Sequence, residues 1–213
     1  LIGSSKVAGH LKKLHPKIHR LRAILGLDAK NAAIVLADAD IELAVRECLS
    51  GALAFIGQRC TAIKMLIVHR SIVQRFLKRC TEELGKLKIG MPWEKDVSIT
   101  PLAEPGKAAY LGECVADGLA GGAAIVNDGG AACCESFFYP AVIFPVSEGM
   151  KLYREEQFGP VVPVMPFDDI ETALQYVVSS DHGQQVSIFS SNPDAIATLV
   201  DPLVNQVCRV NIS

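Results

Sequence analysis

Short apolar runs and amphipathic runs alternate along almost the whole chain, and this alternation restricts the fold more than any single motif does. The apolar runs have the length and composition of buried strands and lie at residues 32–36, 63–68, 123–126, 138–144, 161–167, 185–189 and 206–212. Runs with helical spacing of apolar residues separate them, at 38–55, 71–87, 108–119, 170–178 and 194–203. The sequence therefore predicts an α/β fold in which a mainly parallel sheet is flanked by helices.

The size and charge of the chain narrow the class of protein. Half of its 213 residues are hydrophobic, which is enough for a substantial core. The formal charge of −2 gives no general attraction to nucleic acid or to an anionic membrane. No run of about 18 apolar residues exists, and the opening "LIGSS" does not resemble a signal peptide. We expect neither nucleic acid nor membrane as a partner.

The seven cysteines show no regular spacing that would indicate a disulfide framework or a metal site. They stand at positions 48, 60, 80, 114, 133, 134 and 208. A chain of this size does not need disulfides, so we predict free thiols in a reducing compartment, the cytoplasm. Neither CxxC nor HExxH occurs and the five histidines are scattered, so no metal site is predicted.

The first 25 residues differ from the rest because basic side chains gather there. These are Lys6, Lys12, Lys13, Lys17, Arg20 and Arg22. We interpret the run as a solvated helix face, and a phosphate-binding role is the alternative.

The stretch "FIGQRCTAIK" places Cys60 in a polar turn between a helix-like run and a strand-like run. Ligands of parallel α/β sheets collect where strands meet loops, so Cys60 could face such a crevice. A thiolate there is a competent nucleophile toward a carbonyl carbon. The residue type alone favours a structural role, since free cysteine usually behaves as a small hydrophobic residue.

Several segments, in the correct order, resemble the aldehyde dehydrogenase superfamily. "IGQRCTAIK" is similar to its active-site segment, and "KNAAIVLADADIELAV" to the strand and helix before it. "MKLYREEQFGPVVPV" resembles its cofactor segment, "QVCRVNIS" its closing strand, and "LIGSSKVAG" the phosphate-side turn of its cofactor domain. The resemblance covers essentially the whole chain. It implies the catalytic-domain fold of this family and the oxidation of an aldehyde with NAD(P).

The resemblance also implies roles for individual residues. Cys60 matches the nucleophile, whose thiolate adds to the aldehyde and which carries a thioester after hydride has passed to the nicotinamide. Its backbone N–H would supply half of an oxyanion hole. Glu156 matches the carboxylate that holds the nicotinamide ribose, and Phe158 matches the ring beside the nicotinamide. Gly3 and Ser4 resemble a turn at the cofactor pyrophosphate, although such a pair before a helix is often only a cap.

Two departures from the family stand out. The family's general-base glutamate lies in an "ELGGK" segment, and the corresponding "GLDAK" has Gly26 at that position. Glycine cannot accept a proton, and Asp28 is shorter and displaced by two residues. The second departure is size, because the family's long cofactor-binding domain, an oxyanion-hole asparagine and a cofactor-anchoring lysine have no counterpart. We therefore expect residues 1–25 to end a cofactor-binding domain, residues 26–213 to form the catalytic domain, and this chain alone to be inactive.

Arg59 indicates which aldehyde is used. An arginine beside the nucleophile suits a phosphate or carboxylate on the substrate, and the alternative is a bond from Arg59 to a nearby backbone carbonyl. "GQRCTA", "GMPWEKDVSITPL" and "EEQFGPVVPV" are most similar to the non-phosphorylating glyceraldehyde-3-phosphate dehydrogenases of the family. That branch usually uses NADP, so NADP, or else NAD, is the expected cofactor.

Three hypotheses follow for the function. The first is an oxidoreductase, the catalytic portion of a homo-oligomeric aldehyde dehydrogenase that acts on glyceraldehyde 3-phosphate. The second is a catalytically impaired member with a structural or binding role, for which Gly26 is the argument. The third, a cofactor-free thiol hydrolase, needs a histidine partner for Cys60 that no spacing in the sequence supplies.

Overall fold

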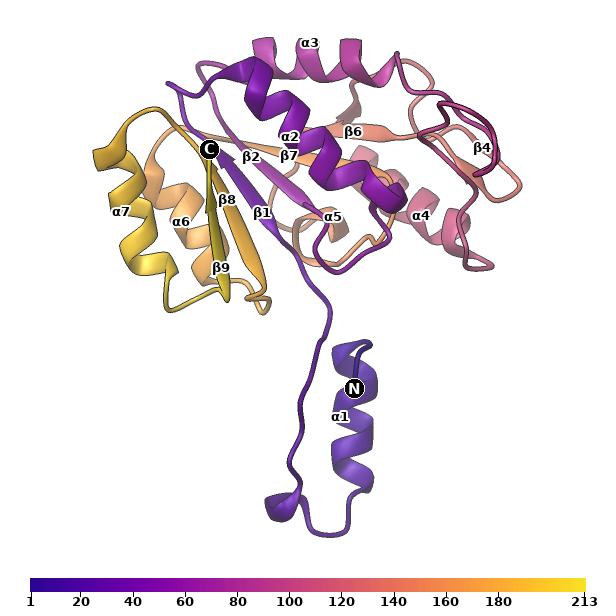
Figure 1. The fold of residues 1–213 in the computed structure, drawn as a ribbon, viewed down its shortest axis with the longest axis vertical. Helices are drawn as coiled ribbons and strands as arrows, with labels where there is room; N and C mark the ends of the chain where they lie inside the picture. Colours follow the sequence, from indigo (N-terminus) through magenta and orange to yellow (C-terminus); the bar gives the residue numbers. More distant parts are fainter.

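The computed structural model describes residues 1–213 and contains a seven-stranded sheet with the order β3-β6-β7-β2-β1-β8-β9. The strands are β1 (Ala32–Val35), β2 (Met65–His69), β3 (Ala124–Ile125), β6 (Ala141–Phe144), β7 (Val161–Phe167), β8 (Gln185–Phe189) and β9 (Arg209–Ile212). Every neighbouring pair is parallel except β3 with β6 at one edge. The predicted mainly parallel sheet is confirmed (Figure 1).

Helices cover both faces of this sheet, as predicted. They are α2 (Ile41–Leu53), α3 (Val73–Leu84), α4 (Lys107–Ala120), α5 (Lys151–Arg154), α6 (Ile170–Val178) and α7 (Pro193–Leu203). A further helix, α1 (Ser5–Leu14), does not cover the sheet (Figure 1). Helices α2 and α3 pack on one face, and α4, α6 and α7 on the other. The side chains of Asp40, Asp169 and Asn192 accept bonds from first-turn N–H groups of α2, α6 and α7, which fixes where these helices begin.

The core divides into two layers because successive strand residues point to opposite faces. In β1, Ala33 and Val35 join the cluster under α2 and α3, while Ile34 joins the cluster under α4, α6 and α7. All four residues of β1 are buried. The central strands are therefore apolar throughout, as expected of a sheet covered on both sides.

The structure differs from the sequence-based expectation in the region of residues 133–144. The predicted strand at 138–144 is divided in two, because Tyr139 and Pro140 lie outside any strand. Its first part, β5 (Phe137–Phe138), pairs with β4 (Cys133–Cys134) in a separate antiparallel hairpin. Only its second part, β6, enters the main sheet. Phe137 and Phe138 pair with Cys134 and Cys133, so the apolar run contributes to two separate sheets.

The end of α2 has an unusual backbone that bends the chain toward the Cys60 turn. Three successive residues, Phe55, Ile56 and Gly57, have φ angles of 54°, 57° and 68°. This left-handed region is sterically unfavourable for residues with a Cβ atom. The helix predicted over 38–55 therefore stops at Leu53, and strain is concentrated next to the candidate nucleophile.

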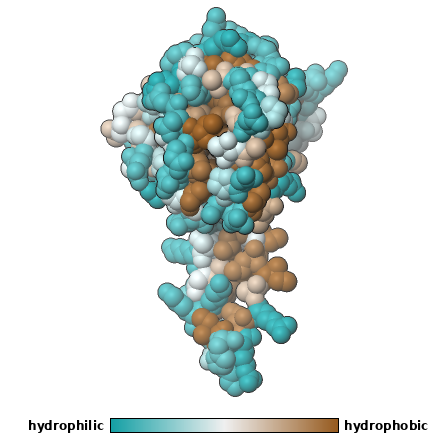
Figure 2. Space-filling view, turned by 90° about the vertical axis from the view of Figure 1, so that its left-hand side faces the viewer, coloured by the Kyte–Doolittle hydropathy of each residue, from teal (hydrophilic) through white to brown (hydrophobic).

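The N-terminal 25 residues form an arm that stands away from the body of the molecule (Figure 1). Helix α1 carries three of the basic side chains, Lys6, Lys12 and Lys13, and the other three follow it in the arm; all six are exposed. An isolated bridge between Ile2 and Gly26 joins the two segments of the arm, and the carboxylate of Asp28 accepts bonds from the N–H and the hydroxyl of Ser5. Apolar side chains are also exposed along the arm (Figure 2), at Leu1, Ile2, Val7, Leu11, Leu14, Ile18 and Ile24.

Candidate active site

One open cleft of about 580 Å³ brings together residues from the arm and from the starts of four strands. It is lined by Ile2, Gly3, Ser4, Gly26, Leu27, Asp28, Cys60, Glu104, Lys107, Tyr110, Glu156, Phe158 and Gln184. The lining segments lead into β1, β2, β7 and β8, so the cleft lies at the amino ends of parallel strands. Many parallel sheets bind ligands at the opposite edge, the carboxyl ends.

Cys60 is exposed in this cleft, and side chains from the sheet hold its loop from behind. The Nδ2 amide of Asn31 donates to the carbonyl oxygens of Cys60 at 2.7 Å and Ala62 at 2.9 Å. The Nε2 of Gln185 donates to the carbonyl of Thr61 at 2.9 Å. The loop is therefore fixed through its carbonyl groups, while the N–H of Cys60 donates to no group of the chain.

Glu156 and Phe158 lie on the opposite wall, in the segment that leads into β7. One carboxylate oxygen of Glu156, Oε1, accepts from the N–H of Ala29 at 3.2 Å and pairs with Lys64 at 3.1 Å. Both contacts use Oε1, which leaves Oε2 for a ligand in the cleft. Phe158 has a φ of 44°, a strained conformation that turns its backbone toward the cleft edge.

The arm supplies the third wall. Gly3 and Ser4 lie at the start of α1, where the Ser4 hydroxyl accepts from the N–H of Val7. Gly26 lies beside them and Asp28 follows. Because Asp28 already accepts two bonds from Ser5, it serves as a link to the arm, and the structure gives it no separate role toward Cys60.

Arg59 is the predicted site residue that does not line this cleft. Its guanidinium lies 5.7 Å from the ring centroid of Phe55. The Nε of Arg59 is buried and has no hydrogen-bond partner in the chain. The Nε of Arg59 therefore does not make the bond to a backbone carbonyl that a purely structural role would involve. A donor in this state is costly unless a ligand accepts from it.

Sequence reasoning missed the residues at the mouth of the cleft. Lys107 lies 5.1 Å from the ring of Tyr110 and 5.7 Å from the ring of Phe158, and it pairs with Glu104 at 3.2 Å. The hydroxyl of Tyr110 donates to the carbonyl of Glu156 at 3.1 Å. The available signal was the "PGK" turn, which starts α4 after a long loop and so projects polar side chains from a helix end.

A second signal was missed, a lysine directly before an apolar strand. Lys30 is buried behind the cleft, and its Nζ donates to the carbonyl of Glu155 at 2.8 Å and to Oε1 of Gln157 at 2.7 Å. Burial, and then the nearby charge of Lys64, lower the pKa of Lys30 to about 7. Burial also lowers the pKa of Lys64, against the opposing effect of Glu156. Two lysine side chains thus end beneath the cleft.

The pH dependence of stability is expected to change when Lys30 is replaced by methionine. Between pH 7 and 10.5 the unfolded chain holds a proton on Lys30 that the folded chain lacks. The free energy of unfolding of the wild type therefore rises with pH, by at most about 1.4 kcal/mol per pH unit, and Lys30→Met loses this contribution. Urea unfolding at pH 7 to 8.5 measures it, with the exposed Lys13→Met as control. Parallel curves for wild type and Lys30→Met would contradict the burial argument.

The reactivity of the seven thiols is expected to single out Cys60. Burial raises the pKa of Cys48 and of Cys114, and raises that of Cys80 to about 12, so these thiols should react slowly. The remaining four are exposed, and among them Cys60 has the buried Lys64 ammonium close to it. Limiting iodoacetamide followed by peptide mass mapping should label Cys60 first. Faster labelling in the β4–β5 hairpin, at Cys133 and Cys134, would argue against the assignment.

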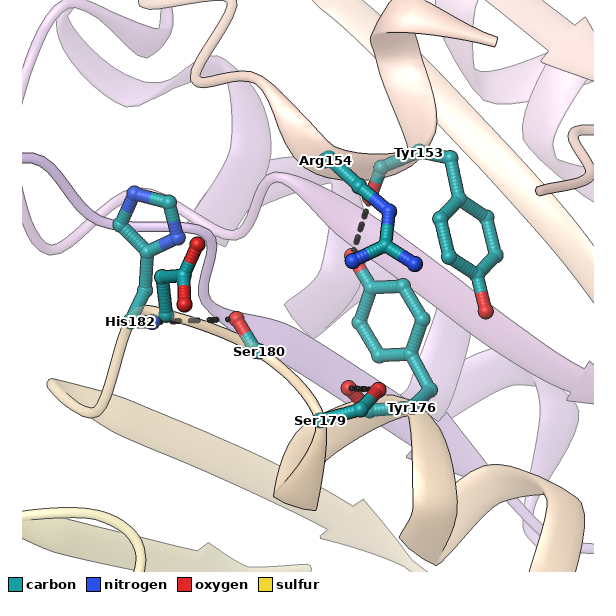
Figure 3. Close-up of a pocket in the computed structure, with 7 residues that line it drawn as sticks. Tyr153, Arg154, Tyr176, Ser179, Ser180 and His182 are labelled. Atoms are coloured by element: carbon teal, nitrogen blue, oxygen red, sulfur yellow. Dashed lines mark hydrogen bonds between the residues drawn. The ribbon is translucent and has the colours of Figure 1, made fainter. Parts of the chain in front are cut away.

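A second, much smaller cavity of about 30 Å³ lies between the end of α5, helix α6 and the loop after α6 (Figure 3). The hydroxyl of Tyr176 donates to the carbonyl of Tyr153 at 2.9 Å, and the two rings meet edge to face at 5.0 Å. Burial raises the pKa of Tyr176. The N–H of His182 donates to the hydroxyl of Ser180 (Figure 3). The cavity has room for about one water, and its loop leads to Gln184 of the cleft.

No three or more histidine, cysteine, aspartate or glutamate side chains come together as a metal site would require. None of the helices has the length and apolar character needed to cross a membrane.

Known proteins of the same fold match this chain along its length. The model of the aldehyde dehydrogenase family matches residues 1–213. The NADP-dependent glyceraldehyde-3-phosphate dehydrogenase of Streptococcus equinus is 33% identical over 188 residues, which are 86% of this chain and 37% of that protein. Aldehyde dehydrogenase family 7 member B4 of Arabidopsis thaliana is 31% identical over 211 residues, 99% of this chain and 41% of that protein.

A solved structure agrees with these relatives. The NADP-dependent glyceraldehyde-3-phosphate dehydrogenase of Bacillus halodurans C-125, complexed with NADP, superimposes with a TM-score of 0.89 at 31% identity. The match covers 100% of this chain and 43% of that one. The chain therefore spans about two fifths of the length of the proteins that it matches.

Proposed function

Because the chain belongs to the aldehyde dehydrogenase family, we propose that it carries the catalytic part of an NAD(P)-dependent enzyme that oxidises an aldehyde through a thioester on Cys60. The proposed substrate is glyceraldehyde 3-phosphate, the proposed cofactor is NADP or else NAD, and the proposed location is the cytoplasm. Residues 1–25 would end the cofactor-binding domain and residues 26–213 would form the catalytic domain.

One observation carries the proposal: Cys60, Glu156 and Phe158 line the same cleft although they are far apart in the sequence. Their walls meet at the amino ends of β2 and β7, which are neighbouring strands. The match to glyceraldehyde-3-phosphate dehydrogenases supports the choice of substrate, as those relatives are 28% to 33% identical. The relatives named NADP-dependent support the choice of cofactor.

The residues of the cleft fit a nicotinamide nucleotide. Oε2 of Glu156 has no partner in the chain and can accept from ribose hydroxyls in the cleft, while the ring of Phe158 offers an apolar surface there. Gly3 and Ser4 lie at the N-terminal end of α1, a position that favours a phosphate, although the N–H groups of Ser5 and Val7 already donate to Asp28 and Ser4 there. When bound, the nicotinamide would supply the acceptor for hydride.

The chain's own groups would carry the remaining steps. The thiolate of Cys60 adds to the carbonyl carbon of the aldehyde, and the free N–H of Cys60 can donate to the developing oxyanion. Loss of hydride leaves an acyl group on the sulfur. Asn31 and Gln185 hold the loop carbonyls through this sequence of events, so the sulfur and the N–H keep their relative positions.

The role of Arg59 can be tested without a cofactor, since an aldehyde that adds reversibly to Cys60 protects it from alkylation. Glyceraldehyde 3-phosphate should protect Cys60 at lower concentration than glyceraldehyde does. Arg59→Leu should raise the protecting concentration of the phosphorylated aldehyde by about 10- to 150-fold, the loss expected for a charged hydrogen bond of about 1.5–3 kcal/mol. Protection by glyceraldehyde should not change. Equal losses for both aldehydes would assign Arg59 a structural role and remove this support for a phosphorylated substrate.

A second function has a specific observation in its favour. Gly26 occupies the position of the family's general base, and Asp28 is bound to Ser5. A member with slow thioester hydrolysis could serve as a binding or structural domain. The lifetime of the acyl group on Cys60 separates the two functions. Rapid hydrolysis of this thioester favours an enzyme, and a long-lived thioester favours a binding or structural domain.

A further inference from the structure

We propose that Lys64 is a positioning residue of the candidate active site, one that ties the backbone of the Cys60 loop to the side chains of Glu156 and Phe158. The inference rests on the proposed role of Cys60 as the nucleophile. It assigns a function to a side chain that lies outside the cleft lining, directly before β2.

The first observation is the set of backbone acceptors around the ammonium of Lys64. It donates to the carbonyl of Arg59 at 2.9 Å, of Cys60 at 3.1 Å and of Ala62 at 3.4 Å. These three carbonyls belong to one turn, and only a group inside that turn can reach all of them. Lysine presents three donors from a compact, rotatable head, which suits such a cage of carbonyls.

The second observation is that the same ammonium contacts the opposite wall. It pairs with Oε1 of Glu156 at 3.1 Å and lies 5.8 Å from the ring centroid of Phe158. The side chain of Lys64 is only 2% exposed and that of Glu156 is 16% exposed. At this burial solvent screens the pair weakly, so the two charges constrain each other strongly.

These contacts give Lys64 a role that no other described residue shares. Asn31 and Gln185 also hold the Cys60 loop, but their recorded partners do not include Glu156 or Phe158. A displacement of Glu156 would therefore reach the Cys60 loop mainly through Lys64. The ammonium of Lys64 also attracts a thiolate on Cys60, and Glu156 offsets part of that attraction.

A double-mutant cycle on Cys60 alkylation tests the coupling in the 213-residue chain, using Lys64→Met, Glu156→Gln and the double variant. Removal of Lys64 should slow iodoacetamide alkylation of Cys60, and Glu156→Gln should speed it. The effect of Glu156→Gln should depend on Lys64 by about 2- to 150-fold, the fold-change that corresponds to coupling between contacting residues. If the change in alkylation rate in the double variant equals the product of the changes in the two single variants, the proposal is overturned.

A pH profile separates positioning from a general loss of structure. The curve of Cys60 alkylation against pH should move to higher pH in Lys64→Met, while that of the exposed Cys208 should not move. The charged groups that face Lys64 are Glu156, Arg59 and Lys30, and all three are present in both proteins. Rapid labelling of the buried Cys48 and Cys80 would reveal unfolding. An unchanged Cys60 curve in a folded variant would also overturn the proposal.

Lys64→Met leaves Glu156 without its cation. If that variant does not fold, a second comparison replaces it. Comparison of Glu156→Gln with the double variant then measures the effect of Lys64 in a background without the carboxylate charge. Slower alkylation in the double variant supports the proposal, and equal rates overturn it. A wild-type Cys60 that does not react at all would instead refute the proposed function, so the two failures are distinguishable.

Discussion

Replacement of Gly57 by alanine is expected to lower the free energy of unfolding by about 2–5 kcal/mol. Gly57 has a φ of 68°, and a Cβ there would approach the carbonyl oxygens of Gly159 at 2.6 Å and Ala52 at 2.8 Å. The left-handed backbone costs about 1–2 kcal/mol for a residue with a Cβ, and forcing an atom into a packed site costs about 1–3 kcal/mol more. Because both contacts are backbone atoms, neither can move away by a rotamer change.

Gly129→Ala is the matched control for this change. Its φ of 67° is almost the same, but the nearest atoms belong to the ring of Tyr139 at 3.9 Å, an ordinary contact. Gly129→Ala should therefore show the backbone cost alone. Urea unfolding followed by far-ultraviolet circular dichroism measures both variants. The close approach of Gly57 to Gly159 joins the Cys60 and Phe158 segments. If both variants lose the same free energy of unfolding, this approach adds nothing to the cost of Gly57→Ala.

Replacement of Gly26 by glutamate is expected to speed hydrolysis of an acyl group on Cys60 by about 10²–10⁴-fold, the usual contribution of a positioned base. Gly26 and Cys60 line the same cleft, and a Cβ at Gly26 would meet only the Ile2 side chain at 3.5 Å. A glutamate can therefore enter without displacing backbone. The acyl-enzyme formed from p-nitrophenyl acetate, followed by mass, reports the rate in the 213-residue chain without a cofactor.

Gly26→Gln has the same size and no proton acceptor of comparable strength, so it is the control. It should leave the lifetime of the acyl group close to that of the wild type. If glutamine accelerates hydrolysis as much as glutamate, the change acts by packing and not by proton transfer. Rapid hydrolysis in the wild type would show that another group is already the base.

The order of strands and helices could be predicted because the pattern is local. Residues 170–178 were predicted as a helix and form α6 with the same bounds, and 161–167 form β7. The failures lie where pairing or backbone conformation overrides local propensity. The hairpin of β4 with β5 takes the first part of an apolar run, and the left-handed residues after Leu53 end a helix that its composition would have continued.

The site could be predicted only in part, since the family resemblance named individual residues and not their surroundings. Cys60, Glu156, Phe158, Gly3 and Ser4 line one cleft, and their roles there stay predictions. The buried lysines behind them stand in the segments "GLDAK" and "IGQRCTAIK", but no role was predicted for either, because lysine is normally read as a surface residue. Only the tertiary structure shows that Lys30 and Lys64 end inside the protein, where carbonyl and carboxylate oxygens surround them.

The position of the cleft at the amino ends of the strands has a consequence for how such a site can diversify. Its floor consists of residues within a few positions of the starts of β1, β2, β7 and β8, so the floor has almost no loop of its own to absorb a change. A substitution in the floor therefore shifts the start of a strand, and the close-packed core transmits that strain. The rim at Glu104, Lys107 and Tyr110 instead lies at the start of a single helix, after a long loop. New substrates should therefore be acquired by altering the rim, while the floor keeps one arrangement over long evolutionary times.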